Sequence, residues 1–249
     1  MKLKGLLVCI LLLVGTTSAF ALDATLTVGE GFYTAGGTVT VPVVLKTNGN
    51  SISAVALDVE YDTTLLSNPI GTLGVAASTA KKGLYSNVLT PTGTVGKYRL
   101  LITGGMTEDA ANPKGGTMTD VTTTGTSGLL VDGVVALVKF NVASSATGSI
   151  TVGSFVDASD PNANAVVVNG TVGGMAAGKV GDCNGSGGVS LSDLTYAINI
   201  VIKKPNFTFN NRCDINMSNG IWNPDGKTTL ADVTTLINVI IKKPNWILP

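Results

Sequence analysis

The feature that most constrains this chain is a segment that occurs twice near its C-terminal end. Leu191–Asn206 (LSDLTYAINIVIKKPN) and Leu230–Asn245 (LADVTTLINVIIKKPN) are identical at ten of sixteen positions, at an offset of 39 residues. A match this long indicates a duplicated supersecondary unit. Whatever the first copy folds into, the second must therefore fold into as well.

Each copy has apolar residues at helical spacing. The stripes are Leu194, Ala197, Ile198, Val201 and Ile202 in the first copy, and Val233, Leu236, Ile237, Ile240 and Ile241 in the second. Paired lysines end both segments, where they suit the helix dipole, and Pro205 and Pro244 stop the helices. Because neither helix is stable alone in water, we expect the two stripes to bury each other as an antiparallel pair.

A twelve-residue loop precedes the first helix. Side-chain oxygens stand at its positions 1, 3, 5, 9 and 12, which are Asp182, Asn184, Ser186, Ser190 and Asp193. Position 6 is a glycine, where the chain must turn sharply, and Gly188 at position 7 offers its backbone carbonyl. Calcium needs six or more oxygens, and alternate residues around a tight turn supply them. The spacing is the EF-hand loop pattern, with Asp in place of Glu at position 12.

The second loop follows the same pattern around an insertion. Its matching positions are Asp214, Asn216, Asp225, Lys227 through its carbonyl, Thr229 and Asp232. Eight residues, Met217–Pro224, stand where one belongs. The insertion either bulges outward and leaves the ligands in place, or abolishes the site. Three aspartates favour retained binding, because clustered carboxylates without a cation would repel one another.

The rest of the chain lacks helical spacing of its apolar residues and has β-type alternation instead. Between residues 22 and 172, short stretches of alternating Val, Thr and Ala are separated by Gly-rich turns, which predicts an all-β sandwich. Strands are expected at Ala24–Val28, Thr38–Leu45, Ala54–Tyr61, Tyr98–Thr103, Gly133–Val142, Ser149–Val152 and Ala165–Val172, and a long loop at 104–127. Residues 173–179 are predicted to be a linker to the helical part, 180–249.

The N-terminal end predicts export. A short basic start, an apolar run and the sequence Ala19-Phe20-Ala21 form the pattern of a signal peptide over residues 1–21. The apolar run is too short to span a bilayer. Beyond it, only Cys183 and Cys213 remain, and an even count in an exported protein favours a disulfide, with two unpaired buried thiols as the alternative. Such a bridge would join the two loops.

Composition excludes several functions. The chain has no histidine, which excludes Ser-His-Asp and Cys-His nucleophilic schemes and His-ligated zinc. Basic and acidic residues balance at 16 each, without a basic stripe, so nucleic acid is not an expected partner.

The tandem loop-plus-helix repeat resembles the dockerin module of cellulosome-type assemblies, over residues 180–249. The resemblance implies calcium-dependent folding, with the loop oxygens named above as ligands. It also implies that a cohesin partner contacts loop positions 10 and 11, which here are Leu191 with Ser192, and Leu230 with Ala231.

The β region in turn resembles a cohesin over residues 24–172. The matching segments are Val28–Glu30, Gly36–Val43, Ala54–Asp62 with Leu65-Leu66, Gly133–Phe140 and Val166–Gly170. The resemblance implies a jelly-roll sandwich, a fold that cohesins share with some carbohydrate-binding modules. Fold alone does not separate those roles.

We therefore expect an exported, non-catalytic assembly protein of the cohesin–dockerin type, secreted or held at the cell surface, with calcium as its cofactor. Its expected partners are cohesin- or dockerin-bearing proteins, including a second copy in head-to-tail contact. A link to extracellular polysaccharide degradation follows from the resemblance. The seven-residue linker predicts that the tail has difficulty folding back onto its own sandwich.

Two other functions are weighed against this one. A carbohydrate-binding sandwich needs exposed planar aromatics, whereas aromatics are 5% of the chain and both tryptophans lie in the helical part. A glycoside hydrolase needs two facing carboxylates, and Asp58, Glu60 and Asp62 alternate along one strand. A solvated strand face explains those three residues more simply.

Overall fold

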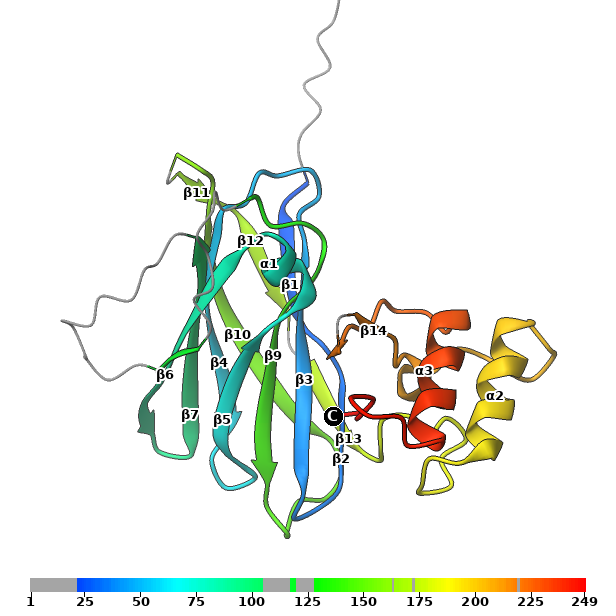
Figure 1. The fold of residues 1–249 in the computed structure, drawn as a ribbon. Coiled ribbons are helices and arrows are strands. Elements are labelled where there is room, and N and C mark those ends of the chain that lie inside the picture. The colour runs from blue at the N-terminus through cyan, green and yellow to red at the C-terminus, as the bar shows by residue number, and fades with distance from the viewer. Residues whose placement is uncertain (1–21, 105–116, 120–127, 163, 172, 219) are drawn as a thin grey trace, which may run out of the picture.

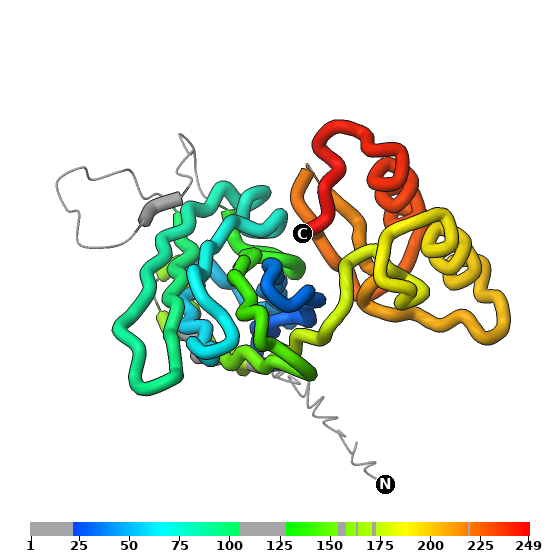
Figure 2. Tube along the Cα trace, turned by 90° about the horizontal axis from the view of Figure 1, so that it is seen from below, coloured from blue at the N-terminus to red at the C-terminus, as the bar shows by residue number. Residues whose placement is uncertain are grey.

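The computed structural model describes residues 22–104, 117–119, 128–162, 164–171, 173–218 and 220–249. Within these ranges the chain forms a β-sandwich, residues 22–177, and a small C-terminal unit, residues 178–249, that lies beside it (Figures 1 and 2). No helix in the described ranges has the length and apolar character to cross a membrane. The predicted signal peptide and most of the expected loop at 104–127 lie outside the described residues.

Two sheets face each other in the sandwich (Figure 1). The larger sheet has the order β2 (Gly31–Tyr33), β13 (Gly173–Ala177), β10 (Ile150–Ser159), β4 (Ala54–Asp62), β7 (Val95–Gly104), β6 (Lys82–Thr92) and β8 (Thr117–Thr119), with β11 (Ala165–Val166) paired to β10. The smaller sheet has the order β12 (Val168–Thr171), β1 (Ala24–Val28), β3 (Thr38–Lys46), β9 (Gly133–Val142) and β5 (Leu66–Leu73), and a short helix, α1 (Val75–Thr79), follows β5.

Alternation explains the core. Along β4 every second side chain is buried, and the intervening ones are half-exposed on the outer face. Phe140 of β9 is fully buried and meets Tyr61 of β4 with ring centroids 5.1 Å apart, so the two sheets interlock through aromatic as well as aliphatic contacts. The backbone N–H of Gly71 donates to the buried Tyr98 hydroxyl at 2.7 Å, which satisfies both groups. The all-β sandwich predicted from the alternating segments is confirmed.

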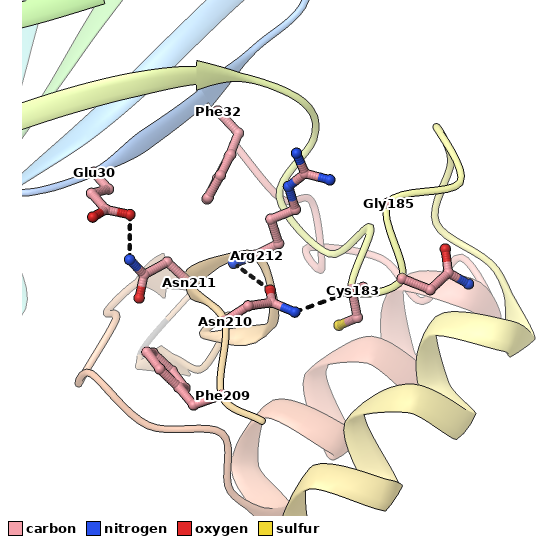
Figure 3. A pocket seen from close by; sticks show the side chains of 9 residues that line it. Glu30, Phe32, Cys183, Gly185, Phe209, Asn210, Asn211 and Arg212 are labelled. Carbon is pink, nitrogen blue, oxygen red and sulfur yellow. Dashed lines mark hydrogen bonds between the residues drawn. The ribbon is translucent and has the colours of Figure 1, made fainter. Parts of the chain in front are cut away.

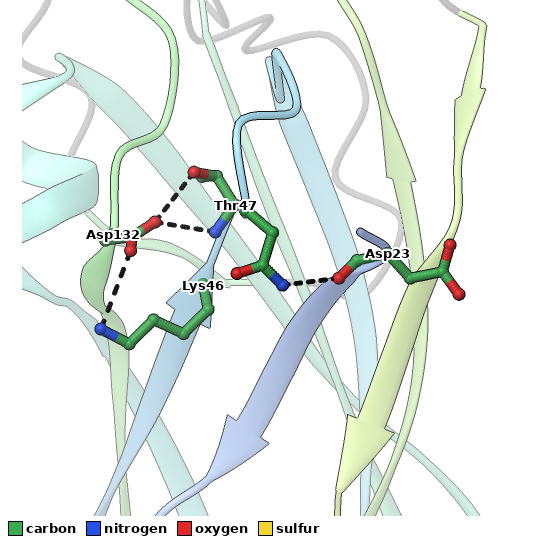
Figure 4. A network of polar contacts seen from close by, with 5 residues as sticks. Asp23, Lys46, Thr47 and Asp132 are labelled. Carbon is green, nitrogen blue, oxygen red and sulfur yellow. Dashed lines mark hydrogen bonds and ion pairs between the residues drawn. The ribbon is translucent and has the colours of Figure 1, made fainter. Parts of the chain in front are cut away.

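One end of the smaller sheet is held by a polar network (Figure 4). The Asp132 carboxylate accepts from the Thr47 N–H and hydroxyl, both at 2.8 Å, and lies 3.7 Å from the Lys46 ammonium. The Thr47 N–H is the main reason that the pKa of Asp132 lies below its usual value. Asn48 donates to the carbonyl of Asp23 at 2.7 Å, which fixes the chain where it enters β1.

Several elements differ from the sequence-based expectation. Strands β2, β5 and β6 and the helix α1 have no counterpart among the predicted elements, and β8 lies within the segment expected to be a loop. The strand expected at Ala165–Val172 is divided into β11 and β12. Residues 173–177, expected to be linker, form β13, which pairs with β2 and β10. The sandwich therefore extends five residues further than its sequence pattern indicates.

The C-terminal unit contains the two expected helices, α2 (Leu191–Val201) and α3 (Leu230–Ile240), with a 3-10 turn, η1 (Asn211–Cys213), between them. A two-stranded hairpin, β14 (Met217–Ser218) with β15 (Ile221–Trp222), precedes α3. Both helices begin with a capping box, formed by Ser190 with Asp193 and by Thr229 with Asp232.

Only part of each predicted stripe is buried. Ala197, Val233 and Leu236 are buried in the apolar cluster of the unit, and Leu194, Val201 and Ile240 pack against it. Ile198 and Ile237 are each 40% exposed, and Ile202 and Ile241 are each 64% exposed. The expectation that the whole stripes bury each other is wrong, because two short helices contact along a narrow seam and leave the flank of each stripe in solvent.

Candidate functional site

The first loop is organised around the carboxylates at its two ends. Asp182 accepts from the N–H groups of Ser186 and Gly187, both at 2.8 Å. Asp193 accepts from the Asn184 N–H at 3.0 Å and from the Ser190 N–H and hydroxyl at 2.9 and 2.8 Å. Both aspartates are almost completely buried. The structure thus brings positions 1, 3, 5, 9 and 12 of the loop together.

The amide of Asn184 takes part in this arrangement in two ways. Its oxygen accepts from the Ser186 N–H at 2.8 Å, and its nitrogen donates to the Ser192 hydroxyl at 2.7 Å. Gly188 at position 7 is half-buried.

The second loop repeats this hydrogen-bond pattern despite its insertion. Asp214 accepts from the N–H groups of Asp225 and Gly226 at 3.0 and 2.6 Å. Asp232 accepts from the Asn216 N–H at 2.8 Å and from the Thr229 N–H and hydroxyl at 2.7 and 3.0 Å. Each contact has its counterpart in the first loop, at the same loop position.

The inserted residues leave the loop as the hairpin β14–β15. Its base is closed by the N–H of Asn223, which donates to the carbonyl of Asn216 at 2.9 Å. The Trp222 indole N–H donates to the carbonyl of Asp214 at 3.1 Å, and the Trp222 side chain is 5% exposed. The inserted residues thus form a hairpin, and the loop positions on either side of it keep the hydrogen-bond pattern of the first loop.

The second loop also leaves an oxygen without a partner. The side-chain oxygen of Asn216, at position 3, is buried and accepts no hydrogen bond from the described residues. Burying an amide oxygen in this way costs free energy, and a cation would compensate it. Burial raises the pKa of Asp214 to about 7; the N–H groups of Asp225 and Gly226 lower it in part, and the Asp232 and Asp225 carboxylates raise it. The donor set therefore fits an oxygen-seeking cation.

The candidate metal ligands of the loops include neutral oxygens as well as carboxylates. Across the part of the chain that the structure describes, no three His, Cys, Asp or Glu side chains gather into a metal-holding group. The first loop has two carboxylates, and its other candidate donors are an amide, two hydroxyls and a carbonyl. In the second loop, Asp225 accepts from the Lys227 N–H at 3.0 Å.

A disulfide joins Cys183, at position 2 of the first loop, to Cys213, just before the second. The two cysteines are 30 residues apart in sequence, their Cα atoms are 5.1 Å apart, and both are buried. The bridge ties the starts of the two loops together.

Replacing both cysteines by serine is expected to destabilise the C-terminal unit by roughly 3 to 4 kcal/mol, because a closed loop of this length restricts the unfolded chain. Guanidinium unfolding, followed by helix circular dichroism, measures the loss. The sandwich transition, followed by tyrosine absorbance, should stay where it is. An unchanged C-terminal transition would show that the bridge contributes nothing to stability.

Two matching apolar surfaces remain exposed on the helices. Leu191 and Leu230 are 67% and 70% exposed, and their neighbours Ser192 and Ala231 are exposed as well. These are the four residues that the sequence resemblance assigns to partner contact. The exposed isoleucines at the ends of α2 and α3 extend each surface along its helix.

The outer face of the larger sheet is a second open surface. On it, the Arg99 guanidinium donates to both oxygens of Asp58 at 2.7 Å, and Lys97 pairs with Glu60 at 2.6 Å. The hydrogen bond from Arg99 holds the pKa of Asp58 below its usual value. Two residues along β7 from Arg99, Leu101 lies on the same face. It is paired across the strands with Ala56 of β4 on one side and Tyr85 of β6 on the other.

Each of the three carboxylates of β4 has a partner in this arrangement. Asp58 and Glu60 are engaged by cations, and Asp62 accepts from the N–H and hydroxyl of Thr64 at 2.8 and 2.6 Å. The three carboxylates thus serve ion pairs and a turn. Leu101, Lys97 and Arg99 are not among the residues predicted from the sequence to be functional, although period-two alternation from residue 97 to 103 places all three on the outer face.

Residues 24–175 match the family model described as the cohesin domain. Among solved structures, the sixth cohesin of scaffoldin B from Acetivibrio cellulolyticus, in complex with a Cel5 dockerin mutant, is 24% identical; the match covers 63% of this chain and 99% of that one, with a TM-score of 0.45.

Two further structures are similar. A type I cohesin–dockerin complex from Clostridium thermocellum is 16% identical, covering 63% of this chain and 99% of that one with a TM-score of 0.47. A non-cellulosomal cohesin from the archaeon Archaeoglobus fulgidus is 17% identical, covering 62% and 90% with a TM-score of 0.41. No curated protein sequence matches the chain.

Proposed function

The chain belongs to the cohesin family, and from this premise we propose that it is a non-catalytic assembly protein with two separate docking surfaces. Its sandwich receives a dockerin-type module, and its C-terminal unit, which resembles a dockerin, docks on a cohesin of another molecule. Cohesin-domain homologues mediate cohesin–dockerin association.

The observation that carries the proposal is the difference between the two outer faces of the sandwich. The smaller sheet has outward apolar residues, Val134 and Leu137, in one cluster with the C-terminal unit. The larger sheet presents the row around Leu101, flanked by the Asp58–Arg99 and Glu60–Lys97 ion pairs. An apolar centre with a charged rim is the usual composition of a protein-binding surface. We therefore assign the incoming partner to the β4–β7–β6 face.

The C-terminal unit contributes the second surface in this proposal. Leu191 and Leu230 are exposed at equivalent positions of the two repeats, with Ser192 and Ala231 beside them. Solvent-exposed leucines and isoleucines in a connected stripe favour a protein partner, because an apolar surface of this kind is costly to leave in water.

Calcium is the proposed cofactor of this unit. Asp182, Asn184, Ser186, Gly188, Ser190 and Asp193 would hold one ion, and Asp214, Asn216, Asp225, Lys227, Thr229 and Asp232 a second. The ion would neutralise the buried carboxylates and bring the two ends of each loop together. The residues at position 12 have a further task, because Asp193 and Asp232 also cap α2 and α3. Cation binding and helix formation are thereby joined in one side chain.

The protein is exported in this proposal. Residues 1–21 have the pattern of a signal peptide, and calcium at millimolar concentration is a condition of the extracellular space rather than of the cytosol. A role in polysaccharide degradation is proposed through the partners that the chain would assemble.

Replacing Leu101 by aspartate is expected to weaken binding of a dockerin module by at least about thirtyfold, the effect of losing a central apolar contact worth about 2 kcal/mol. The chain from residue 22 onward is immobilised, and binding of a panel of dockerin modules, including this chain's own C-terminal unit on a second copy, is measured with calcium.

The matched control is Ile70→Asp, the same type of change at a 56% exposed position of the other sheet. It should bind as the parent does. The assignment fails if Leu101→Asp binds normally, if Ile70→Asp is the variant that loses binding, or if no dockerin binds the parent chain.

A further inference from the structure

The connection between the sandwich and the C-terminal unit is very short. The last backbone hydrogen bond on the sandwich side runs from the Gly178 N–H to the Tyr33 carbonyl at 2.9 Å. The first on the other side runs from the Gly181 N–H to the Arg212 carbonyl at 2.8 Å. Only Lys179 and Val180 stand between them, and Val180 is 3% exposed. A connection of two residues, one of them buried, allows little reorientation.

Arg212 bridges the two parts at the same place (Figure 3). Its guanidinium donates to the carbonyl of Ala177, the last residue of β13, at 3.1 Å. It also lies over the ring of Phe32 in β2, 5.3 Å from the ring centroid, which is cation–π distance. Arg212 follows Asn211 in η1, and Asn211 donates to the Glu30 carboxylate. One turn of the C-terminal unit thus contacts three points on the β2–β13 edge.

The position of η1 is itself fixed. Cys213 follows Arg212 directly and is bonded to Cys183. Asn210 donates from its side chain to the carbonyl of Cys183 at 3.0 Å and accepts from the Arg212 N–H at 3.0 Å. Arg212 is therefore presented to the sandwich by a rigid support, and little conformational entropy is lost when it binds there.

An apolar contact accompanies this polar one. Val134 and Leu137 are outward residues of β9, yet they are 0% and 8% exposed. They belong to the same apolar cluster as Trp222, Ile215 and Leu236 of the C-terminal unit. The hairpin β14–β15 lies on the side of the unit that faces β3 (Figure 1). The insertion in the second loop thus lies where the unit meets the sheet.

We propose that the Arg212 contact, at the β2–β13 edge of the larger sheet, and the Trp222 cluster, at the outer face of the smaller sheet, lock the C-terminal unit to its own sandwich, so that both parts move as one rigid body. The sequence-based expectation that the tail has difficulty folding back onto its own sandwich is overturned: the unit reaches the face next to its own connection. The insertion in the second loop contributes Trp222 and Ile221 to this apolar cluster.

The lock is independent of any partner, so its test separates it from the proposed function. Backbone 15N relaxation of residues 22–249 with calcium gives rotational correlation times for both parts. One shared correlation time is expected for the parent. The double variant Arg212→Ala, Leu137→Asp should give two, with the C-terminal unit tumbling faster than the sandwich.

Two measurements keep the result interpretable. Helical circular dichroism and calcium stoichiometry of the double variant should match those of the parent, which shows that the unit is folded while released. Ile70→Asp, an equivalent change on the same sheet outside the contact, should keep one correlation time. Two correlation times in the parent, or one in the folded double variant, would overturn the proposal.

Discussion

Replacing Asp232 by alanine is expected to destabilise the C-terminal unit by at least about 3 kcal/mol, because each buried N–H left without an acceptor costs about 1 to 3 kcal/mol. Asp232 is fully buried and accepts from the N–H groups of Ile215, Asn216 and Thr229. The variant removes the closure of the second loop and the cap of α3 in one step. Denaturant unfolding in a Trp246→Phe background, where Trp222 is the remaining reporter, measures the effect.

Asp232→Asn is the matched variant, since it keeps an acceptor oxygen but removes the charge. Without calcium it should lose less stability than Asp232→Ala, because one amide oxygen can still accept from the Ile215 and Asn216 N–H groups, and it should bind one calcium ion fewer. If Asp232→Ala unfolds at the same denaturant concentration as the parent, the loop is not held together by this residue. If Asp232→Asn keeps both ions, the carboxylate is not a ligand.

Calcium is expected to stabilise the C-terminal unit by about 2.7 kcal/mol for each bound ion when its free concentration is one hundred times the dissociation constant. Asp214 and Asp232 are buried at 4% and 0% exposure, and buried carboxylates without a cation are costly. Isothermal calorimetry should count two sites, and a chelator should lower the midpoint of the C-terminal transition.

The sandwich provides an internal control in the same experiment. Its core is formed by apolar side chains of two sheets, and its unfolding midpoint should not respond to calcium. Magnesium at equal concentration should give a smaller shift, because its octahedral geometry suits these loops poorly. A tail that folds equally well without calcium, and binds none at millimolar supply, would contradict the cofactor assignment. One site instead of two would place the loss in the loop with the insertion.

The sequence predicted best where one local rule decides the outcome. Gly133–Val142 is a mostly apolar run rich in valine, and β9 has those bounds. The helices are marked by the repeat and by the prolines that follow them, and α2 and α3 begin at Leu191 and Leu230, the first residues of the two copies. The hydrogen-bond pattern of both loops follows from the same spacing of oxygens. In these places propensity, patterning and capping agree.

The sequence-based predictions that were wrong have a common physical cause, because tertiary contacts decide the structure at those positions. The segment Gly173–Ala177 has small residues with low β propensity, and it becomes a strand because β2 and β10 offer it backbone partners on both sides. Ile198 and Ile202 have the spacing of core residues, but burial depends on how much of a helix its neighbour covers. The Arg212 contact involves residues far apart in sequence, and no local pattern indicates it.

The two-residue connection described above has a consequence for any polymer that this protein builds. If the C-terminal unit of one copy docks on the β4–β7–β6 face of the next, each added copy repeats the same rotation and translation, since no flexible joint absorbs an error. Repetition of one such operation gives a helical fibre of defined pitch, or a closed ring when the rotation divides a full circle. The angle at Lys179 and Val180 would then set the shape of the assembly.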